Sequence, residues 1–199
     1  MPALRHSDLK IIDKFIRIKK TNNYYINLSR NFKKVSKEFK TKEYASVNHD
    51  VQLFKHKRKN IFRKRSEIIS DVIKNNFSKK SKILDFGSSK GNLLIELKKK
   101  GYKNIYAHDI NKSFSNFFKR KKIIFLKKKE ILKEKFDLVI FSHSLSYVEN
   151  IEKILKILMK IVNENGYVIL NCADVSKRPL IFTFSDQKFF FEKKMIKNL

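Results

Sequence analysis

The chain has 199 residues, of which 42% are hydrophobic and 33% are charged. This composition is typical of a folded globular domain and excludes an intrinsically disordered chain. The single cysteine, Cys172, excludes an internal disulfide and a cysteine-cluster zinc site, and it fits a reducing compartment. We see no secretory signal and no apolar run of roughly 18 residues, so we expect a cytoplasmic protein without a membrane span.

The formal net charge of +28 would fit a partner such as nucleic acid or an anionic membrane surface. Of the 47 basic residues, however, 39 are Lys and 8 are Arg, whereas proteins that read nucleic acids tend to use Arg. Residues with A/T-rich codons are favoured throughout the chain. Genomic base composition is therefore an alternative source of the lysines.

The first part of the chain is predicted to be helical and basic. Apolar residues at 9–18 have partial helical spacing, residues 19–23 break that pattern, and residues 32–39 suggest one or two more helical turns. Residues 51–77 predict one long helix, because apolar residues recur at helical intervals. The basic residues at 55–65 on its exposed face are either solvated surface or a phosphate-binding patch.

The stretch Ser81–Leu94, SKILDFGSSKGNLL, predicts a strand, a tight glycine turn and the start of a helix. Gly87 can take backbone angles closed to other residues, and Gly91 lets main chain or ligand approach closely because it has no Cβ. The free amides of the first helical turn favour an anion. The loop is not a P-loop, because Lys90-Gly91-Asn92 lacks the Gly-Lys-Ser/Thr ending. It matches a dinucleotide fingerprint only weakly, because Ser89 stands where that pattern needs a glycine.

A second strand is predicted at 104–108, directly after the helix that follows the loop. Asp109 follows that strand and lies 24 residues beyond Asp85, the distance that a strand-helix-strand unit produces. Its carboxylate can accept hydrogen bonds from both ribose hydroxyls of a nucleoside. The alternative is that Asp109 or Asn111 caps a helix at 112–118.

Three further strands are predicted at 123–126, 136–141 and 167–170. Residues 136–141, FDLVIF, are apolar on both faces, as a central parallel strand requires. We expect Asn150 to cap an amphipathic helix, and Asn165-Gly166 to form the turn before the last strand.

The tail after Asp174 has only 25 residues. It is predicted to form an extended piece at 180–184 and a helix at 188–198. An edge strand left uncovered at this end of the sheet would be a liability for pairing or aggregation.

The glycine loop with its two acidic residues resembles the first motifs of class I S-adenosylmethionine-dependent methyltransferases, whose loop reads roughly D/E-x-G-x-G-x-G. Asp85, Gly87 and Gly91 match that pattern, and Ser89 replaces the middle glycine. The G-S-x-x-G form also looks like the loop of sugar C-methyltransferases. The later run FDLVIFSHSLSYVEN…NENGYVIL resembles the second half of the same core, so the likeness covers residues 80–173.

The resemblance implies an α/β fold, a three-layer Rossmann-like sandwich with a mostly parallel sheet. That domain would span residues 79–199, preceded by a basic helical extension at 1–78. The tail is too short for the sixth and seventh strands that normally close such cores. Either the sheet is short, or the reading frame is truncated.

The resemblance also implies S-adenosylmethionine as the cofactor, no metal, and methyl transfer (EC 2.1.1.-) as the reaction. The implied cofactor-binding residues lie in the loop and after the strands: Asp85, Gly87, Ser88, Ser89, Gly91, Asp109, Ile110 and Ser142. Family members often place an acidic adenine-binding residue after the third strand. Here Lys127–Lys129 stand at that place, and Glu130 is the remaining candidate.

Catalytic candidates follow the fourth strand, because ligands bind at the carboxyl ends of the strands in such sheets. His143 is the candidate base, since an imidazole titrates near neutral pH. The alternative is a histidine with a structural hydrogen bond. Tyr147 and Asp174 are further candidates for the pocket.

The expected methyl acceptor is a small molecule, such as a sugar or another metabolite. Residues 142–145 lack the Asn/Asp-Pro-Pro-aromatic motif of adenine amino methylation, and Cys172 lacks the Pro-Cys context of cytosine methylation. One alternative is an RNA methyltransferase that uses the basic N-terminal helix. The other is a catalytically inactive nucleotide-fold protein or a truncated methyltransferase. The sequence leaves the oligomeric state open.

Overall fold

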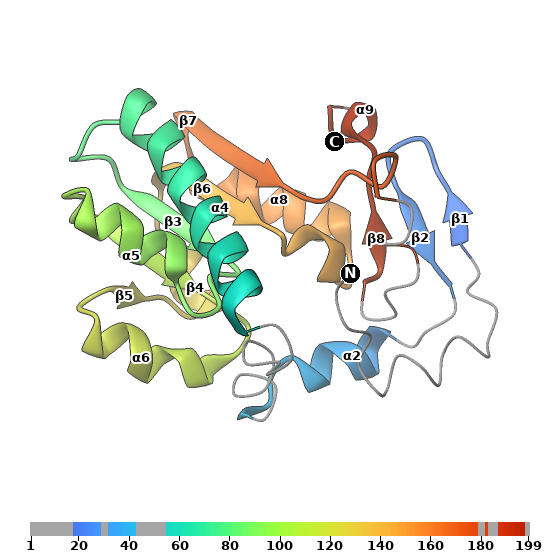
Figure 1. Ribbon diagram of the computed structural model, residues 1–199, viewed down its shortest axis with the longest axis horizontal. Helices are drawn as coiled ribbons and strands as arrows, with labels where there is room; N and C mark the ends of the chain where they lie inside the picture. Colours follow the sequence, from blue (N-terminus) through green and yellow to red (C-terminus); the bar gives the residue numbers. More distant parts are fainter. Residues whose placement is uncertain (1–17, 29–31, 43–54, 179–181, 183–186, 198–199) are drawn as a thin grey trace. The chain divides into compact units, whose positions relative to one another are not determined.

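The structure is a computed structural model that describes residues 18–28, 32–42, 55–178, 182 and 187–197 (Figure 1). The chain divides into two compact units. The first, here the sheet unit, contains residues 39–142 and 156–170. The second, here the hairpin unit, contains residues 1–38, 143–155 and 171–199. The domain boundary expected at residue 78 stays a prediction.

The sheet unit is built on a five-stranded sheet with the order β5-β4-β3-β6-β7. Its strands are β3 (Ile83–Phe86), β4 (Ile105–His108), β5 (Ile124–Phe125), β6 (Phe136–Ser142) and β7 (Val162–Asn171). The first strand of the motif, β3, is central and pairs in parallel with β4 and β6, and β4 pairs in parallel with β5. This mostly parallel sheet with its helices confirms the predicted Rossmann-like α/β fold (Figure 1).

Helices connect these strands along the chain. They are α4 (Lys55–Asn76), α5 (Asn92–Lys99), η2 (Lys112–Phe114), α6 (Ser115–Arg120), α7 (Lys128–Ile131), η3 (Leu145–Tyr147) and α8 (Ile151–Ile161). The amide of Lys153 donates to Asn150 Oδ1 at 2.7 Å, which confirms Asn150 as the cap of α8. β7 already begins at Val162, so the turn predicted at Asn165-Gly166 is wrong. These two residues lie inside the strand.

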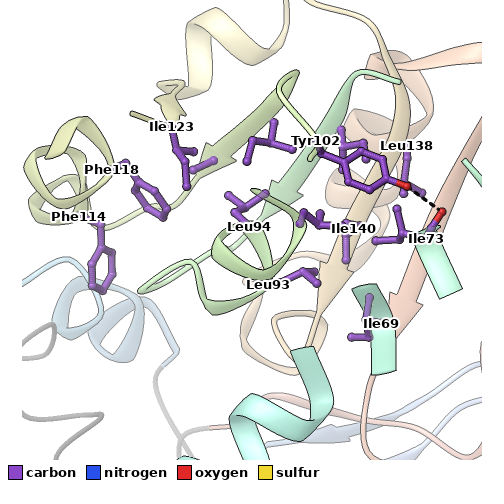
Figure 2. Packing of buried hydrophobic residues seen from close by; sticks show 14 residues of the cluster. Ile69, Ile73, Leu93, Leu94, Tyr102, Phe114, Phe118, Ile123, Leu138 and Ile140 are labelled. Carbon is purple, nitrogen blue, oxygen red and sulfur yellow. Dashed lines mark hydrogen bonds between the residues drawn. The ribbon is translucent and has the colours of Figure 1, made fainter. Parts of the chain in front are cut away.

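The core of the sheet unit joins one face of the sheet to two helices (Figure 2). Ile69 and Ile73 of α4 and Leu94 of α5 pack with Leu138 and other apolar side chains of the strands. The hydroxyl of Tyr102 donates to the carbonyl oxygens of Ile73 and Phe77, at 3.2 Å and 2.9 Å. The helical period of α4 therefore buries one stripe of the helix, as the sequence predicted.

The hairpin unit contains a small antiparallel sheet with the order β1-β2-β8. Its strands are β1 (Ile18–Lys20), β2 (Tyr25–Asn27) and β8 (Phe189–Phe190). The turn between β1 and β2 is organised by Thr21, whose Oγ1 accepts from the amide of Tyr24 at 3.0 Å and donates to its carbonyl at 2.6 Å. The helical extension predicted at 1–78, with its break at residues 19–23, is therefore wrong at Ile18–Lys20 and Tyr25–Asn27, which form strands. The turn-forming Thr21-Asn22-Asn23 was the signal of a hairpin.

Other predictions for the ends of the chain have mixed outcomes. The helix suggested at 32–39 is confirmed as α2 (Phe32–Glu38). The helix suggested at 9–18 lies outside the described residues, apart from Ile18, which is in β1. A continuous helix at 188–198 is wrong, because β8 pairs with β2 and only α9 (Lys193–Ile196) is helical.

The extended piece predicted at 180–184 also lies outside the described residues, except for Phe182. Among the helices that the structure describes, none combines the length and the apolar character that a membrane crossing requires.

Candidate functional site

The glycine loop between β3 and α5 has an unusual backbone. Gly87, Ser89 and Gly91 have φ angles of 84°, 47° and 65°, so every second residue of the loop is in the left-handed region. That region is open to glycine but strained for most other residues. Ser89, which replaces the middle glycine of the family motif, therefore adopts the backbone conformation that a glycine would adopt there.

The carbonyl oxygen of His108, at the end of β4, anchors this loop. It accepts hydrogen bonds from the amides of Gly87 and Ser88, at 2.7 Å and 3.0 Å, and from the Ser88 hydroxyl at 3.2 Å. Ser88, a predicted cofactor residue, is buried. These bonds fix the loop to the strand that carries Asp109.

Gly91 is required by packing against the protein itself. A Cβ at this position would lie 2.3 Å from the Phe118 ring, which is fully buried. The sequence predicts a close approach of main chain or ligand to Gly91. In the structure the group that approaches Gly91 is the Phe118 ring. Gly91 is also the N-cap residue of α5, and no side chain caps that helix end.

Asp109 faces the glycine loop. Its Oδ2 accepts from the amide of Ser89 at 2.9 Å, and its Oδ1 accepts from the amide of Asn111 at 2.8 Å. The helix-capping alternative is settled in favour of Asn111, whose side chain accepts from the amide of Ser113. The free lone pairs of the Asp109 carboxylate can still accept hydrogen bonds from hydroxyl groups.

Asp85 is 5% exposed, and no described residue donates a hydrogen bond to its carboxyl group. Burial raises its pKa to about 7, and the nearby charge of Asp109 adds to the rise. Burial also raises the pKa of Asp109, although the amides of Asn111 and Ser89 oppose that rise. A buried carboxylate without a donor is costly, and a ligand that donates hydrogen bonds or carries positive charge would offset that cost.

The two remaining predicted cofactor residues lie at strand ends of the same unit. Ile110, next to Asp109, is 46% exposed although it is apolar. Ser142 is half-buried at the end of β6. The sheet unit thus contains all eight predicted cofactor residues.

His108 was missed by the sequence analysis. Its side chain is 4% exposed, and Nδ1 lies 2.8 Å from the carbonyl oxygen of Leu126, to which the protonated nitrogen donates. Burial lowers the pKa of this imidazole and so favours its neutral form. Its position directly before Asp109, inside an otherwise apolar strand, was the available signal.

Glu130 has a structural role in the protein. Its Oε2 accepts from the amide of Lys127 at 2.5 Å, which closes the first turn of α7. Glu130 was the remaining candidate for the adenine contact, and its carboxylate is engaged in this hydrogen bond within the protein. Among the described residues, no cluster of His, Cys, Asp or Glu could hold a metal ion.

The predicted catalytic residues belong to the hairpin unit. His143 has a φ of 54°, and its amide donates to the carbonyl oxygen of Asn171 at 2.6 Å. The hydroxyl of Tyr147 accepts from Gln187 Nε2 at 3.3 Å. Asp174 accepts from the hydroxyl and the amide of Ser176, at 2.7 Å and 3.1 Å, and the hydroxyl bond is the main reason that its pKa is lowered.

The hairpin unit also contains a hollow that the sequence did not reveal. Its volume is about 360 Å³. The lining residues come from the β1–β2 turn and from the first turns of α8: Thr21, Asn22, Asn23, Tyr24, Ile151, Glu152 and Leu155. None of them is basic, in a chain with 47 Lys and Arg residues, so the hollow suits a neutral or cationic molecule.

Comparison with known proteins agrees with this architecture. The magnesium protoporphyrin IX methyltransferase of Synechocystis PCC 6803, solved with bound SAH, has a TM-score of 0.64 at 15% identity, with 84% of this chain and 86% of that chain covered. A SAM-dependent methyltransferase from Archaeoglobus fulgidus has a TM-score of 0.53 at 19% identity, covering 67% of this chain and 66% of that chain.

One matched structure is much longer than this chain. This chain spans 35% of a coclaurine N-methyltransferase, which covers 53% of this chain at 18% identity and a TM-score of 0.45. No curated protein matches the sequence significantly. A family model described as a methyltransferase domain matches residues 54–188, which is more than half of the chain. The chain therefore belongs to the methyltransferase domain family.

Proposed function

We propose that this protein transfers a methyl group from S-adenosylmethionine to a small molecule. The observation that carries the proposal is that two acidic side chains lie near each other: Asp85, a buried carboxyl group to which no described residue donates, and Asp109, whose carboxylate accepts from the amide of Ser89 in the glycine loop. Asp85 lies near the carboxyl end of β3 and Asp109 directly follows β4, at the edge of the parallel sheet where ligands of such folds bind. The family assignment and the similar structure solved with bound SAH support the same cofactor.

The residues of the sheet unit fit such a cofactor. Asp109 would accept hydrogen bonds from the ribose hydroxyls, and exposed Ile110 would cover a face of the adenine. The uncapped amides at the start of α5 would face its carboxylate, and Asp85 would face its positive charge. Bound S-adenosylmethionine supplies an electrophilic methyl group, so the protein mainly has to position the reactants and exclude water.

His143 and Tyr147 are the proposed groups for the acceptor. His143 directly follows Ser142, the last residue of β6, and its left-handed backbone is unusual for a residue without a special role. An imidazole there would take a proton from the acceptor, and the Tyr147 hydroxyl would orient it. The hollow lined by Asn22, Tyr24 and Glu152 has a volume suited to a small molecule and supports an acceptor of that size.

Thermal unfolding with S-adenosylhomocysteine tests this proposal. The expected result is a rise in melting temperature that grows with ligand concentration, because the ligand binds only the folded state. Adenosine and ATP are the controls. A protein that melts unchanged at millimolar S-adenosylhomocysteine would support the inactive nucleotide-fold alternative instead.

RNA as the acceptor is the second candidate, and one observation favours it. A groove of about 380 Å³ in the sheet unit is lined by five basic side chains and two isoleucines: Lys98, Lys99, Arg120, Lys121, Lys122, Ile95 and Ile123. Such a groove could follow a phosphate backbone. Binding to RNA that survives 0.2 M salt and prefers one sequence would favour this candidate, because contacts to phosphates alone weaken steeply with salt.

A further inference from the structure

The β7 strand forms one edge of the five-stranded sheet. It runs for ten residues, Val162–Asn171, and pairs with β6 on one side. In the part of the chain that the structure describes, no strand pairs with its other side (Figure 1). An open edge of this length exposes a row of backbone donors and acceptors that can pair with another strand.

The opposite edge of the sheet is protected. β5 has only two residues, Ile124–Phe125, and lysines stand on both sides of it at Lys121, Lys122 and Lys127–Lys129. Short edge strands and edge lysines are the usual means of preventing unwanted pairing. The edge at β5 is therefore protected against pairing, whereas the edge at β7 is not.

β7 contains no lysine or arginine, and neither does the longer stretch from Ile161 to Ser176. The only charged residue of β7 is Glu164. The run Tyr167–Leu170 is as apolar as the interior of a sheet, yet Tyr167 is 64% exposed and Val168 to Leu170 are only half-buried. In neighbouring β6, by contrast, Leu138 to Phe141 are all buried. β7 thus has the composition of a covered strand and the exposure of an uncovered one.

We propose that β7 pairs antiparallel with β7 of a second copy of this chain, so that one sheet continues through both copies. A two-fold interface places the same strand against itself, and a strand with lysines would then bring like charges together. β7 lacks lysines although each copy carries a net charge of +28, so it is a place where two copies can approach.

The apolar residues also define the register of this pairing. With Val168 opposite Val168 of the second copy, Tyr167 lies opposite Ile169 of that copy, and Ile169 lies opposite its Tyr167. Aromatic and β-branched side chains in cross-strand pairs stabilise a sheet. In the same register Glu164 lies beyond the paired segment, so the two carboxylates do not face each other.

Analytical ultracentrifugation of the wild-type protein and two lysine variants tests whether β7 forms the interface of a dimer. Measurements at 0.5 M salt, where the Debye length is about 4 Å, screen the repulsion between the copies. We expect dimers for the wild type and for Ile124→Lys on the protected edge, and monomers for Tyr167→Lys. Circular dichroism and melting curves establish that all three are folded. A monomeric wild type at 100 µM, or dimers that persist in folded Tyr167→Lys, would overturn the proposal.

Disulfide trapping tests the register without depending on the lysine variants. In a Cys172→Ser background, Val168→Cys should form a covalent dimer under mild oxidation, because directly opposite residues of antiparallel strands lie within disulfide reach. Asn165→Cys is the control in the same strand and should stay monomeric. Equal crosslinking of both variants would contradict the register. A monomer whose β7 amides resist hydrogen exchange would mean that another segment of the same chain covers the edge, which also overturns the proposal.

Discussion

Asp85 and Asp109 lie at the carboxyl ends of the adjacent parallel strands β3 and β4, and the charge of Asp109 helps to raise the pKa of Asp85. The proposed cofactor site therefore contains two acidic groups, in a protein with an excess of positive charge. Asp85 is buried and receives no hydrogen bond from any residue that the structure describes, whereas Asp109 accepts from two backbone amides. The two carboxylates should respond differently to pH and to substitution.

The first prediction concerns stability and pH. The pKa of Asp85 is about 7 in the folded protein, against an ordinary value of 3.8. A carboxyl group with a raised folded pKa favours folding at low pH, and this contribution is lost as pH rises from about 4 to about 7. Between pH 5 and pH 8, Asp85→Asn should therefore gain roughly 2–3 kcal/mol in free energy of unfolding relative to the wild type. Urea unfolding at both pH values measures this, with exposed Glu164→Gln as the control. A difference that stays constant with pH would show that Asp85 titrates normally.

The second prediction concerns Asp109 and the cofactor. Asp109→Ala should weaken S-adenosylhomocysteine binding by roughly 1.5–3 kcal/mol, because hydrogen bonds to a charged group contribute about that much. Isothermal titration calorimetry measures the affinity. Glu149→Ala removes an exposed carboxylate elsewhere and should leave the affinity unchanged. If Asp109→Ala binds as tightly as the wild type, the ribose assignment is wrong.

The third prediction concerns the strained serine of the loop. Ser89→Gly should raise the free energy of unfolding by about 0.5–1 kcal/mol, because glycine adopts a φ of 47° without strain. Ser88→Gly, one residue away, should lower it by about 1 kcal/mol, since the hydroxyl bond to His108 is lost. Urea unfolding distinguishes the two. A stabilising Ser88→Gly together with a destabilising Ser89→Gly would contradict this loop geometry.

The fourth prediction concerns the packing of Gly91. Gly91→Ala should cost about 1–3 kcal/mol of stability, because the new Cβ would overlap the Phe118 ring. Replacing the ring by a smaller side chain in Gly91→Ala/Phe118→Leu should recover part of that loss relative to the sum of the two single variants. Strict additivity in the double-mutant cycle would mean that the two residues do not touch.

The fifth prediction concerns His143. Since its φ is 54°, His143→Asn is a better variant than alanine, because asparagine tolerates the left-handed region. Turnover should fall by about 10²–10⁴-fold, the usual effect of losing a general base. The affinity for S-adenosylhomocysteine should stay nearly intact. A variant that loses affinity but keeps its turnover would place His143 in the cofactor site, and no change in either would make it structural.

The sequence by itself determined the features that are encoded over short distances along the chain. The strand, glycine loop and helix around Gly87, and the acidic residue that follows the next strand, could be predicted because hydrophobic period and glycine preference are local properties. The same holds for the cap of α8 at Asn150. These elements sufficed to predict the fold class and the residues proposed to bind the cofactor.

Tertiary structure alone decided which distant segments meet. Phe189–Phe190 pair with Tyr25–Ile26, although the sequence of the tail predicts a helix there. Phe118 makes a glycine necessary at position 91, and the carbonyl of His108 anchors the loop. A strand pairs through backbone groups that every residue possesses, and close packing depends on side chains brought together by the whole fold. For this reason neither a pairing partner nor a packing neighbour is encoded in the residues of one segment.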